Sequence, residues 1–190
     1  MKKFSFSFLL FLSLLFLNVG ATFAQNIYLR AGEYTLKGTT AKGFENYVEI
    51  SGVQFGAEAE VSFTKGTGPA IGKPTFDAIS ITKSVDKLSN ELLRSIATGK
   101  SFPLIEIVVA ARNSQGEQRV AHKIELQDVF VTKISDASAQ CDDCGTLAES
   151  VNFVYKSIRI TTYSFDPKTG APTANANPFE FDVSTMKQDF

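Results

Sequence analysis

The chain has 190 residues, of which 44% are hydrophobic and 21% are charged. A domain of this length can bury a substantial core, so one domain is expected rather than two. The 19 lysines and arginines balance 20 aspartates and glutamates, which argues against a nucleic-acid partner, because such partners favour clustered basic residues.

The first 24 residues have the pattern of a secretory signal peptide. Two lysines precede an apolar run over residues 4–17, and the small residues Thr22 and Ala24 mark a cleavage point after Ala24. The apolar run is shorter than the ~20 residues needed to span a membrane, so no stable membrane anchor is expected. We expect residues 1–24 to be removed and residues 25–190 to form a single exported domain, in the periplasm or the medium.

A glycine-rich stretch over residues 66–72 is the first irregular feature of the exported part. It begins with Gly66, Thr67, Gly68 and Pro69, and it lacks the closing Gly-Lys-Ser/Thr of a phosphate-binding loop. The pattern therefore favours a flexible surface loop over a phosphate site.

One helix is predicted after an alternating strand that ends near Lys83. Ser89 is a candidate N-cap, and Gly99 suits a left-handed stop. Leu92, Leu93, Ile96 and Ala97 form the apolar stripe that we expect to seal one opening of a β-barrel or sandwich.

A hairpin follows the helix. Residues 103–112 are apolar on both faces, as expected of a central strand, and a turn over residues 113–116 leads back through Val120, Ile124 and Leu126. Most of the pattern has a period of two, so the fold class is all-β with one short α-helix.

Cys141 and Cys144 lie in a polar stretch between two predicted strands. A second ligand pair is absent from the sequence and the only histidine, His122, falls in a strand, so a zinc site is disfavoured. Two flanking carboxylates also disfavour a catalytic dithiol. In an exported chain a local disulfide between the two cysteines is the favoured interpretation.

The last third of the chain predicts a bent strand, a turn and a final strand. Val151, Phe153 and Tyr155 share one face, whereas Ile158 and Ile160 share the other, which predicts a bulge near Lys156 and Ser157 at a barrel corner. Residues 166–170 form a strong turn signal, and residues 179–183 are expected to return as a last strand.

The run over residues 76–103 resembles the haemolysin-coregulated protein (Hcp) family, which forms the tube of bacterial type VI secretion systems. A strand with alternating polar and apolar residues is followed by Val-Asp-Lys, a helix with Leu-Leu, and a Gly-Lys turn before a proline. The positions that carry this likeness are Phe76, Ser80, Thr82, Lys83, Val85, Asp86, Lys87, Gly99 and Lys100.

Other segments share the likeness, which covers most of the chain after Asn26. Residues 27–29 and 47–50 resemble the first two strands of the family, residues 126–131 resemble its Leu-x-Asp-Val-x-Val strand, and residues 149–158 resemble its Glu-Ser-Val strand. Familiar members carry no cleavable signal, so the leader is a departure from the family.

The resemblance implies a fold and a structural role. The fold is an Hcp-like β-barrel or sandwich of two sheets with one short helix. Six copies would close into a ring by head-to-tail contacts, and rings would stack into a tube or carry small cargo. Gly66, Thr67, Gly68 and Pro69 lie where the family has its ring-stacking loop, and Asp86 and Lys87 would serve helix start and subunit contact.

The sequence leaves three classes of function open, which we rank in order of preference. A ring-forming structural protein, with secretion-apparatus or effector proteins as partners, is preferred. A secreted β-sandwich that binds a ligand or carbohydrate is the alternative. A secreted hydrolase comes last, because no nucleophile, acid and base constellation is visible, and we expect no enzyme activity, cofactor or metal.

Overall fold

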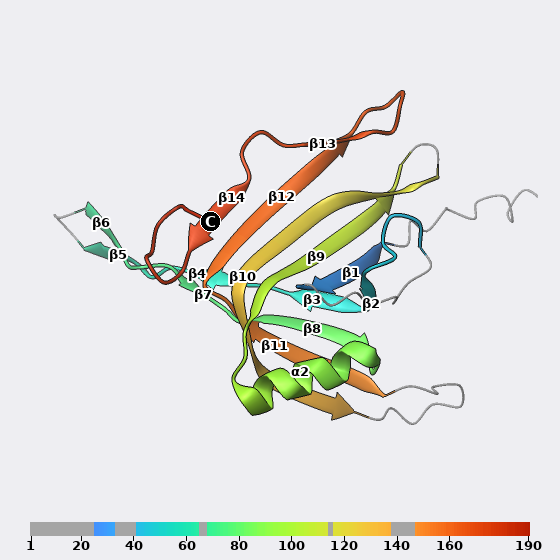
Figure 1. Cartoon of the computed structure of the whole chain (residues 1–190). Coiled ribbons are helices and arrows are strands. Elements are labelled where there is room, and N and C mark those ends of the chain that lie inside the picture. The colour runs from blue at the N-terminus through green and yellow to red at the C-terminus, as the bar shows by residue number, and fades with distance from the viewer. Residues whose placement is uncertain (1–24, 33–40, 65–67, 114–115, 138–146) are drawn as a thin grey trace, which may run out of the picture.

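The computed structural model describes residues 25–32, 41–64, 68–113, 116–137 and 147–190. Figure 1 shows a strand-rich molecule with one helix, α2 (Lys87–Thr98), in this described part. The strands are β1 (Asn26–Ala31), β2 (Val48–Ile50), β3 (Gly52–Gln54), β4 (Ala57–Glu58), β5 (Val61–Thr64), β6 (Gly68–Ile71), β7 (Thr75–Phe76), β8 (Ile79–Ser84), β9 (Phe102–Arg112), β10 (Gln118–Ala137), β11 (Ala148–Val154), β12 (Ser157–Phe165), β13 (Pro172–Ala174) and β14 (Phe179–Asp182). The all-β expectation is confirmed.

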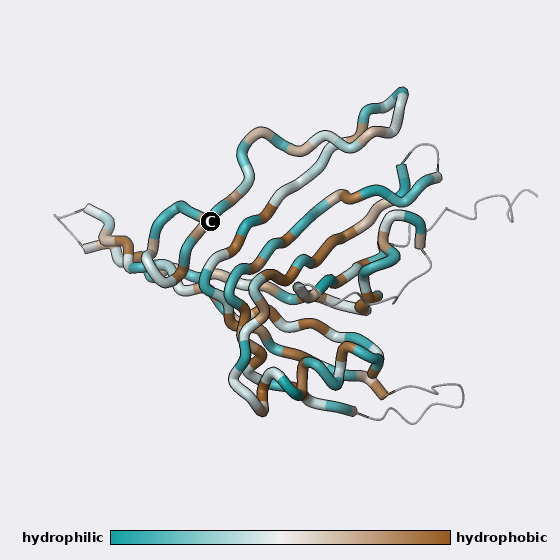
Figure 2. Tube along the Cα trace, viewed as in Figure 1, coloured by the Kyte–Doolittle hydropathy of each residue, from teal (hydrophilic) through white to brown (hydrophobic). Residues whose placement is uncertain are grey.

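The predicted hairpin is formed by β9 and β10, which pair antiparallel from Phe102 to Arg112 of β9. On its other edge β9 pairs with β1, so it is flanked by strands on both sides. This position explains its apolar sequence, since Ile105 and Ile107 face the main core while Val108 and Ala110 are buried on the opposite face. Hydrophobic positions run along β9 in Figure 2.

The long strand β10 joins two sheets. Its first half pairs with β9 and β12, and its second half pairs with β11. The sheet that contains β12 continues to β14, whereas the sheet that contains β11 continues to β8 and β3.

The corner between β11 and β12 corrects one expectation. A bulge was predicted near Lys156 and Ser157, but the strand ends at Val154 and a new strand begins at Ser157. The change of face is as expected: Val151, Phe153 and Tyr155 are buried before the corner and Ile158 is buried after it. A full break lets the chain leave one sheet and join the other.

The barrel closes through β2 and β3, which have only Ser51 between them. β2 pairs with β1 and β3 pairs with β8, so one extended segment belongs to both ends of the hydrogen-bonded path. The Ser51 amide and hydroxyl both donate to the Thr82 carbonyl, at 2.8 and 3.0 Å, and hold the closure.

The helix begins and packs differently from the prediction. Asp86, not Ser89, is the N-cap: its Oδ1 accepts from the Leu88 amide at 2.8 Å, and its own amide donates to Ser89 Oγ at 3.0 Å. Gly99 provides the expected left-handed stop, with φ 67°.

The buried stripe of α2 is also rotated around the helix axis relative to the predicted stripe. Leu88, Leu92 and Ser95 are buried, whereas Leu93 and Ile96 are 48% and 41% exposed, and Ala97 is exposed too. Leu88 and Leu92 pack in the main hydrophobic core with residues of the two sheets, so the helix still covers the core as expected. In the described part of the chain, no helix has both the length and the hydrophobicity required to cross a membrane.

Candidate assembly surfaces

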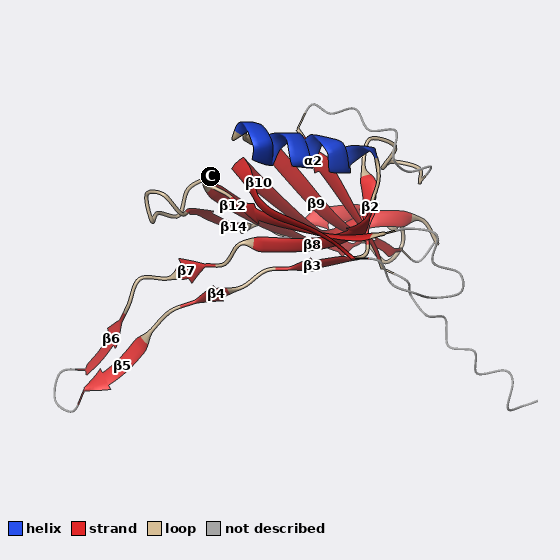
Figure 3. Cartoon of the chain, turned by 90° about the horizontal axis from the view of Figure 1, so that it is seen from below, coloured by secondary structure: helices blue, strands red, loops and turns tan. Residues whose placement is uncertain are grey.

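A two-stranded arm extends from the barrel between β3 and β8. Its base is the β4–β7 pair and its outer part is the β5–β6 pair, and Figure 3 shows both projecting away from the sheets. The Gly72 amide donates to the Glu60 carbonyl at 2.7 Å between the two pairs. A Cβ at Gly72 would lie 3.3 Å from that carbonyl oxygen, so the lack of a side chain permits this close approach.

The arm corrects the expectation of a flexible surface loop over residues 66–72. Gly68 and Pro69 begin β6, and Gly68 has φ 78°, which favours glycine. Gly66 and Thr67 lie outside the described residues. The described part of this segment is therefore a hairpin in register, with Val61 opposite Ile71 and Phe63 opposite Pro69.

Large apolar side chains of the arm face solvent. Val61 is 51% exposed, Ile71 is 73% exposed and Phe63 is 81% exposed. Within the described part of the chain, their strands pair only with each other and form a small sheet separate from the two sheets joined by β10. Exposed apolar groups gathered in this way mark interaction sites in soluble proteins.

Aromatic packing anchors the base of the arm to the last strand. The centroid of the Phe76 ring lies 4.6 Å from that of Phe181 and 6.1 Å from that of Phe179, and the Phe55 ring stacks against it at 6.4 Å. Phe76, singled out by the family motif, therefore joins β7 to β14.

Tyr155 adds a polar contact near the same base. Its hydroxyl donates to the Asp77 carbonyl at 3.3 Å. Burial, with a smaller contribution from the charge of Asp77, raises the pKa of Tyr155 to about 12, so this hydroxyl keeps its proton at physiological pH.

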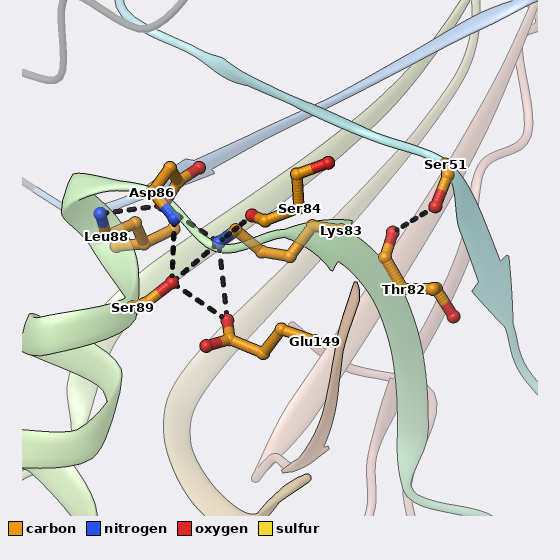
Figure 4. Close-up of polar contacts among 8 residues, drawn as sticks. All are labelled: Ser51, Thr82, Lys83, Ser84, Asp86, Leu88, Ser89 and Glu149. Carbon is orange, nitrogen blue, oxygen red and sulfur yellow. Dashed lines mark hydrogen bonds and ion pairs between the residues drawn. The ribbon is translucent and has the colours of Figure 1, made fainter. Parts of the chain in front are cut away.

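A buried polar cluster lies where β8 leads into α2, as Figure 4 shows. Lys83 Nζ lies 3.3 Å from Glu149 Oε1, 2.8 Å from Asp86 Oδ1, 3.0 Å from Ser89 Oγ and 2.8 Å from the Ser84 carbonyl. Ser89 Oγ in turn donates to Glu149 at 3.2 Å. The side chains of Lys83 and Glu149 are 0% and 1% exposed, so this cluster ties β8, β11 and α2 together beneath the surface.

The other residues of the family motif support this region. Ser80 and Thr82 alternate with the buried Ile79 and Ile81 along β8, and Lys87 is the first, exposed residue of α2. The Val85 amide donates to the Leu147 carbonyl at 3.0 Å. The Lys100 carbonyl accepts from Ser95 Oγ beside the helix stop. These contacts explain the motif by local structure, and Asp86 takes the helix-start role that was expected of it.

A row of charged residues of both signs crosses the sheet on the face away from the main core. The strand registers place five charged residues side by side across the sheet. They are Arg30 of β1, Glu106 of β9, Glu125 of β10, Arg159 of β12 and Glu180 of β14. Lys123 lies between two of them, 3.1 Å from Glu106 and 2.8 Å from Glu125. Sequence reasoning missed this row because it depends on register across five strands.

The electrostatics of this row favour the charged form of Lys123. Burial alone would lower the pKa of Lys123, but its hydrogen bonds to Glu125 and Glu106 outweigh burial and raise it. Arg30 pairs with Glu106 and Arg159 Nε donates to Glu180 at 2.6 Å, so the row is an internally neutralised network.

The remaining candidates of the sequence show no reactive arrangement. His122 lies in β10 as expected, and burial lowers its pKa, which favours the neutral ring. Within the described ranges, no three His, Cys, Asp or Glu side chains are grouped so as to hold a metal ion. Cys141 and Cys144 lie outside the described residues, as do residues 1–24, so the disulfide and the signal peptide stay predictions.

Comparison with known proteins places the chain in a family. The family model described as "Type VI secretion system effector, Hcp" matches residues 28–162. A curated relative from Pseudomonas aeruginosa, named "Major exported protein", is 28% identical over 140 residues, which are 70% of this chain and 80% of the relative.

Solved structures share the fold. The structure of a type six secretion system protein superposes with a TM-score of 0.75 at 21% identity, covering 86% of this chain and 99% of that one. Hcp1 from Salmonella typhimurium superposes with a TM-score of 0.66 at 16% identity, covering 87% of this chain and 99% of its own. The resemblance seen in the sequence is confirmed, and the chain belongs to the Hcp family of type VI secretion system effectors.

Proposed function

We propose that the chain is an exported structural subunit, six copies of which close into a ring by head-to-tail contacts. Rings stack into a tube of the type VI secretion kind or hold small cargo in the lumen. Membership of the Hcp family supports this role, and the name of the Pseudomonas relative supports export. Contacts that use two different surfaces of one subunit close into a ring when the rotation per subunit divides a full turn.

The exposed apolar arm is the observation that carries the proposal. A monomer that keeps Phe63 81% exposed, on a hairpin held away from its own barrel, leaves apolar area that assembly can bury. The arm occupies the segment that resembles the ring-stacking loop of the family. Stacking through the arm would place the function in the subunit surface, and no catalytic group is needed for it.

Export supplies two further parts of the proposal. The leader is cleaved after Ala24, and the chain then meets an oxidising compartment in which Cys141 and Cys144 form a local disulfide. Partners in the secretion apparatus, or effector proteins, would meet the assembled ring rather than a catalytic pocket.

Negative-stain images of protein produced from the full-length chain and recovered after export test this function. The native protein is expected to show six-membered rings and stacks of rings. A variant in which two glycines replace residues 59–73 is expected to show single rings, because the anchored base of the arm remains. Phe63→Ala tests the arm with a smaller change, and Ser62→Ala is the matched control on its opposite face. Images with isolated single subunits for the native protein would contradict the proposal.

A further inference from the structure

A second apolar surface lies at the corner between the two sheets. It is an open groove of about 510 Å³, lined by Ser101, Asp128, Phe130, Val154, Tyr155, Lys156, Val183 and Ser184. Phe130 and Val154 are each 47% exposed and lie directly opposite one another in the β10–β11 pair. Two large apolar side chains thus form an exposed floor where β11 ends.

The backbone geometry at the corner accounts for this exposure. β10 passes from one sheet to the other next to Asp128, whose φ of 48° is left-handed, and the β10–β11 register shifts between Val131 and Lys133. Val129 and Val131 point into the core and Phe130 between them points outward. The fold therefore holds the Phe130 ring on the outer side of the corner.

The arm has a face with matching chemistry. Because side chains alternate along strands, the registers of β5 and β6 put Val61, Phe63, Pro69 and Ile71 on one face. Ser62 and Ala70 are opposite one another on the other face. The described residues of β5 and β6 carry no charge, so one face of the hairpin is purely apolar.

We propose that the apolar face of the arm of one copy docks in the groove of a second copy, with Phe63 packed against Phe130 and Val154. This inference rests on the proposed ring assembly, because it takes a second copy of the chain as the partner. It goes further because it names the surface that receives the arm.

Three observations favour a second copy over another occupant. The arm projects away from its own barrel (Figure 3), and no described residue of the arm lines the groove of the same chain. The groove lies within the range of about 300–1,000 Å³ that receives ligands, which suits a few side chains of a hairpin. Its rim carries one charge of each sign, Asp128 and Lys156 at 3.9 Å, so these two charges offset one another beside the apolar face of the hairpin.

The contact would be head-to-tail, because it joins two different surfaces of the same chain. Every copy then offers one arm and one groove, and the contact repeats from copy to copy. An arm-to-arm contact would instead join only two copies through the same surface. The two arrangements can therefore be distinguished by changing the arm and the groove separately.

Two complementary variants, produced from the full-length chain, test the contact. Phe63→Ala removes the anchor of the arm and keeps the groove, while Phe130→Ser alters the groove and keeps the arm. Each variant alone is expected to lose arm-dependent association by about thirtyfold or more, the size typical of a central aromatic anchor. An equimolar mixture is expected to associate, because the intact arm of one variant meets the intact groove of the other.

Leu93→Ser is the matched control, since Leu93 on α2 is 48% exposed and does not line the groove. It is expected to associate like the native protein. Far-ultraviolet circular dichroism and thermal unfolding verify that each variant is folded, and Val154→Ser replaces Phe130→Ser if the latter is not.

A photo-crosslinking phenylalanine analogue in place of Phe63 maps the contact directly. Intermolecular products are expected in peptides that contain Phe130, Val154 or Val183 of the second copy. The same analogue at Ser62, on the other face of the hairpin, is expected to give few of them.

The outcomes separate this inference from the proposed function. Association could depend on Phe63 while the crosslinks go to another arm or to α2 and the mixture does not recover. That result overturns the proposed contact between arm and groove and leaves ring stacking in place. A native protein that stays monomeric at all concentrations overturns both. Recovery in the mixture together with crosslinks to the groove supports both.

Discussion

Lys83 of β8 and Glu149 of β11 lie directly opposite one another, and their side chains form an ion pair that is almost completely excluded from solvent. A buried charge pair is stable only when its remaining hydrogen-bonding groups are satisfied. Here Asp86, Ser89 and the Ser84 carbonyl meet that requirement, and they do so at the start of α2. The start of the helix and the pairing of the two strands are therefore energetically coupled.

Removing one partner of this ion pair is expected to destabilise the fold strongly. Glu149→Ala leaves Lys83 buried with less compensation, so the free energy of unfolding in urea should fall by about 3–5 kcal/mol. The double variant Lys83→Met with Glu149→Leu should lose less than Glu149→Ala, because it removes the buried lysine charge together with the glutamate that neutralises it. Glu91→Ala, which removes the exposed Arg94 pair on α2, is the control and should cost about 1 kcal/mol or less. Equal losses for Glu149→Ala and Glu91→Ala would contradict the structural role of the buried pair.

The helix cap gives a second test near the same cluster. Asp86→Ala should lower the free energy of unfolding by about 1 kcal/mol for the lost cap, and further for the lost contact with Lys83. Asp86→Asn keeps a capping oxygen and removes only the charge, so it should cost less. Lys87→Ala, at the next and exposed position, is the control. A cost for Asp86→Asn as large as for Asp86→Ala would assign the effect to charge instead of capping.

The sequence predicted elements whose signals are local, and it failed where the decision depended on distant contacts. β9 was predicted because both of its faces are apolar, and the end of α2 because Gly99 follows the last helical turn. Asp86 and Ser89 are both good caps three residues apart, and only the packing of Leu88 against the barrel selects the earlier start. That packing also turns Leu93 and Ile96 outward.

The same distinction holds for the candidate surfaces. The arm segment was recognised by its place in the family pattern, but its glycines hid the hairpin, whose pairing depends on the register of Val61 with Ile71. Lys83 was singled out as a motif residue, yet its pair with Glu149 spans 66 positions of the chain. A cluster of this kind becomes visible only when the strand order is known.

The raised pKa of Tyr155 predicts that the folded protein loses stability at alkaline pH. Its pKa is raised to about 12 in the folded protein, against about 10 in the unfolded chain, so the unfolded state releases this proton first. The stabilising contribution of Tyr155 is complete below pH 10 and is lost as the pH rises towards 12. Between pH 8 and 12, the thermal unfolding temperature should therefore fall more steeply for the native protein than for Tyr155→Phe. Parallel curves for the two proteins would exclude a raised pKa at Tyr155.

The two cysteines provide a test of the compartment. Protein recovered after export should resist alkylation at Cys141 and Cys144 until it is reduced, because the disulfide protects both thiols. Intact-mass measurement of the alkylated protein reports both the protected thiols and the amino terminus, which should be Gln25. Reduced and alkylated protein is the control for complete labelling. Two thiols that react without prior reduction would rule out the disulfide.

The mass of the native assembly in solution tests the central claim most directly. Sedimentation equilibrium of protein recovered after export, over a wide range of concentrations, should give six times the mass of one subunit, with larger species made of whole rings. A folded protein that keeps the mass of a single subunit at the highest concentration would contradict the ring.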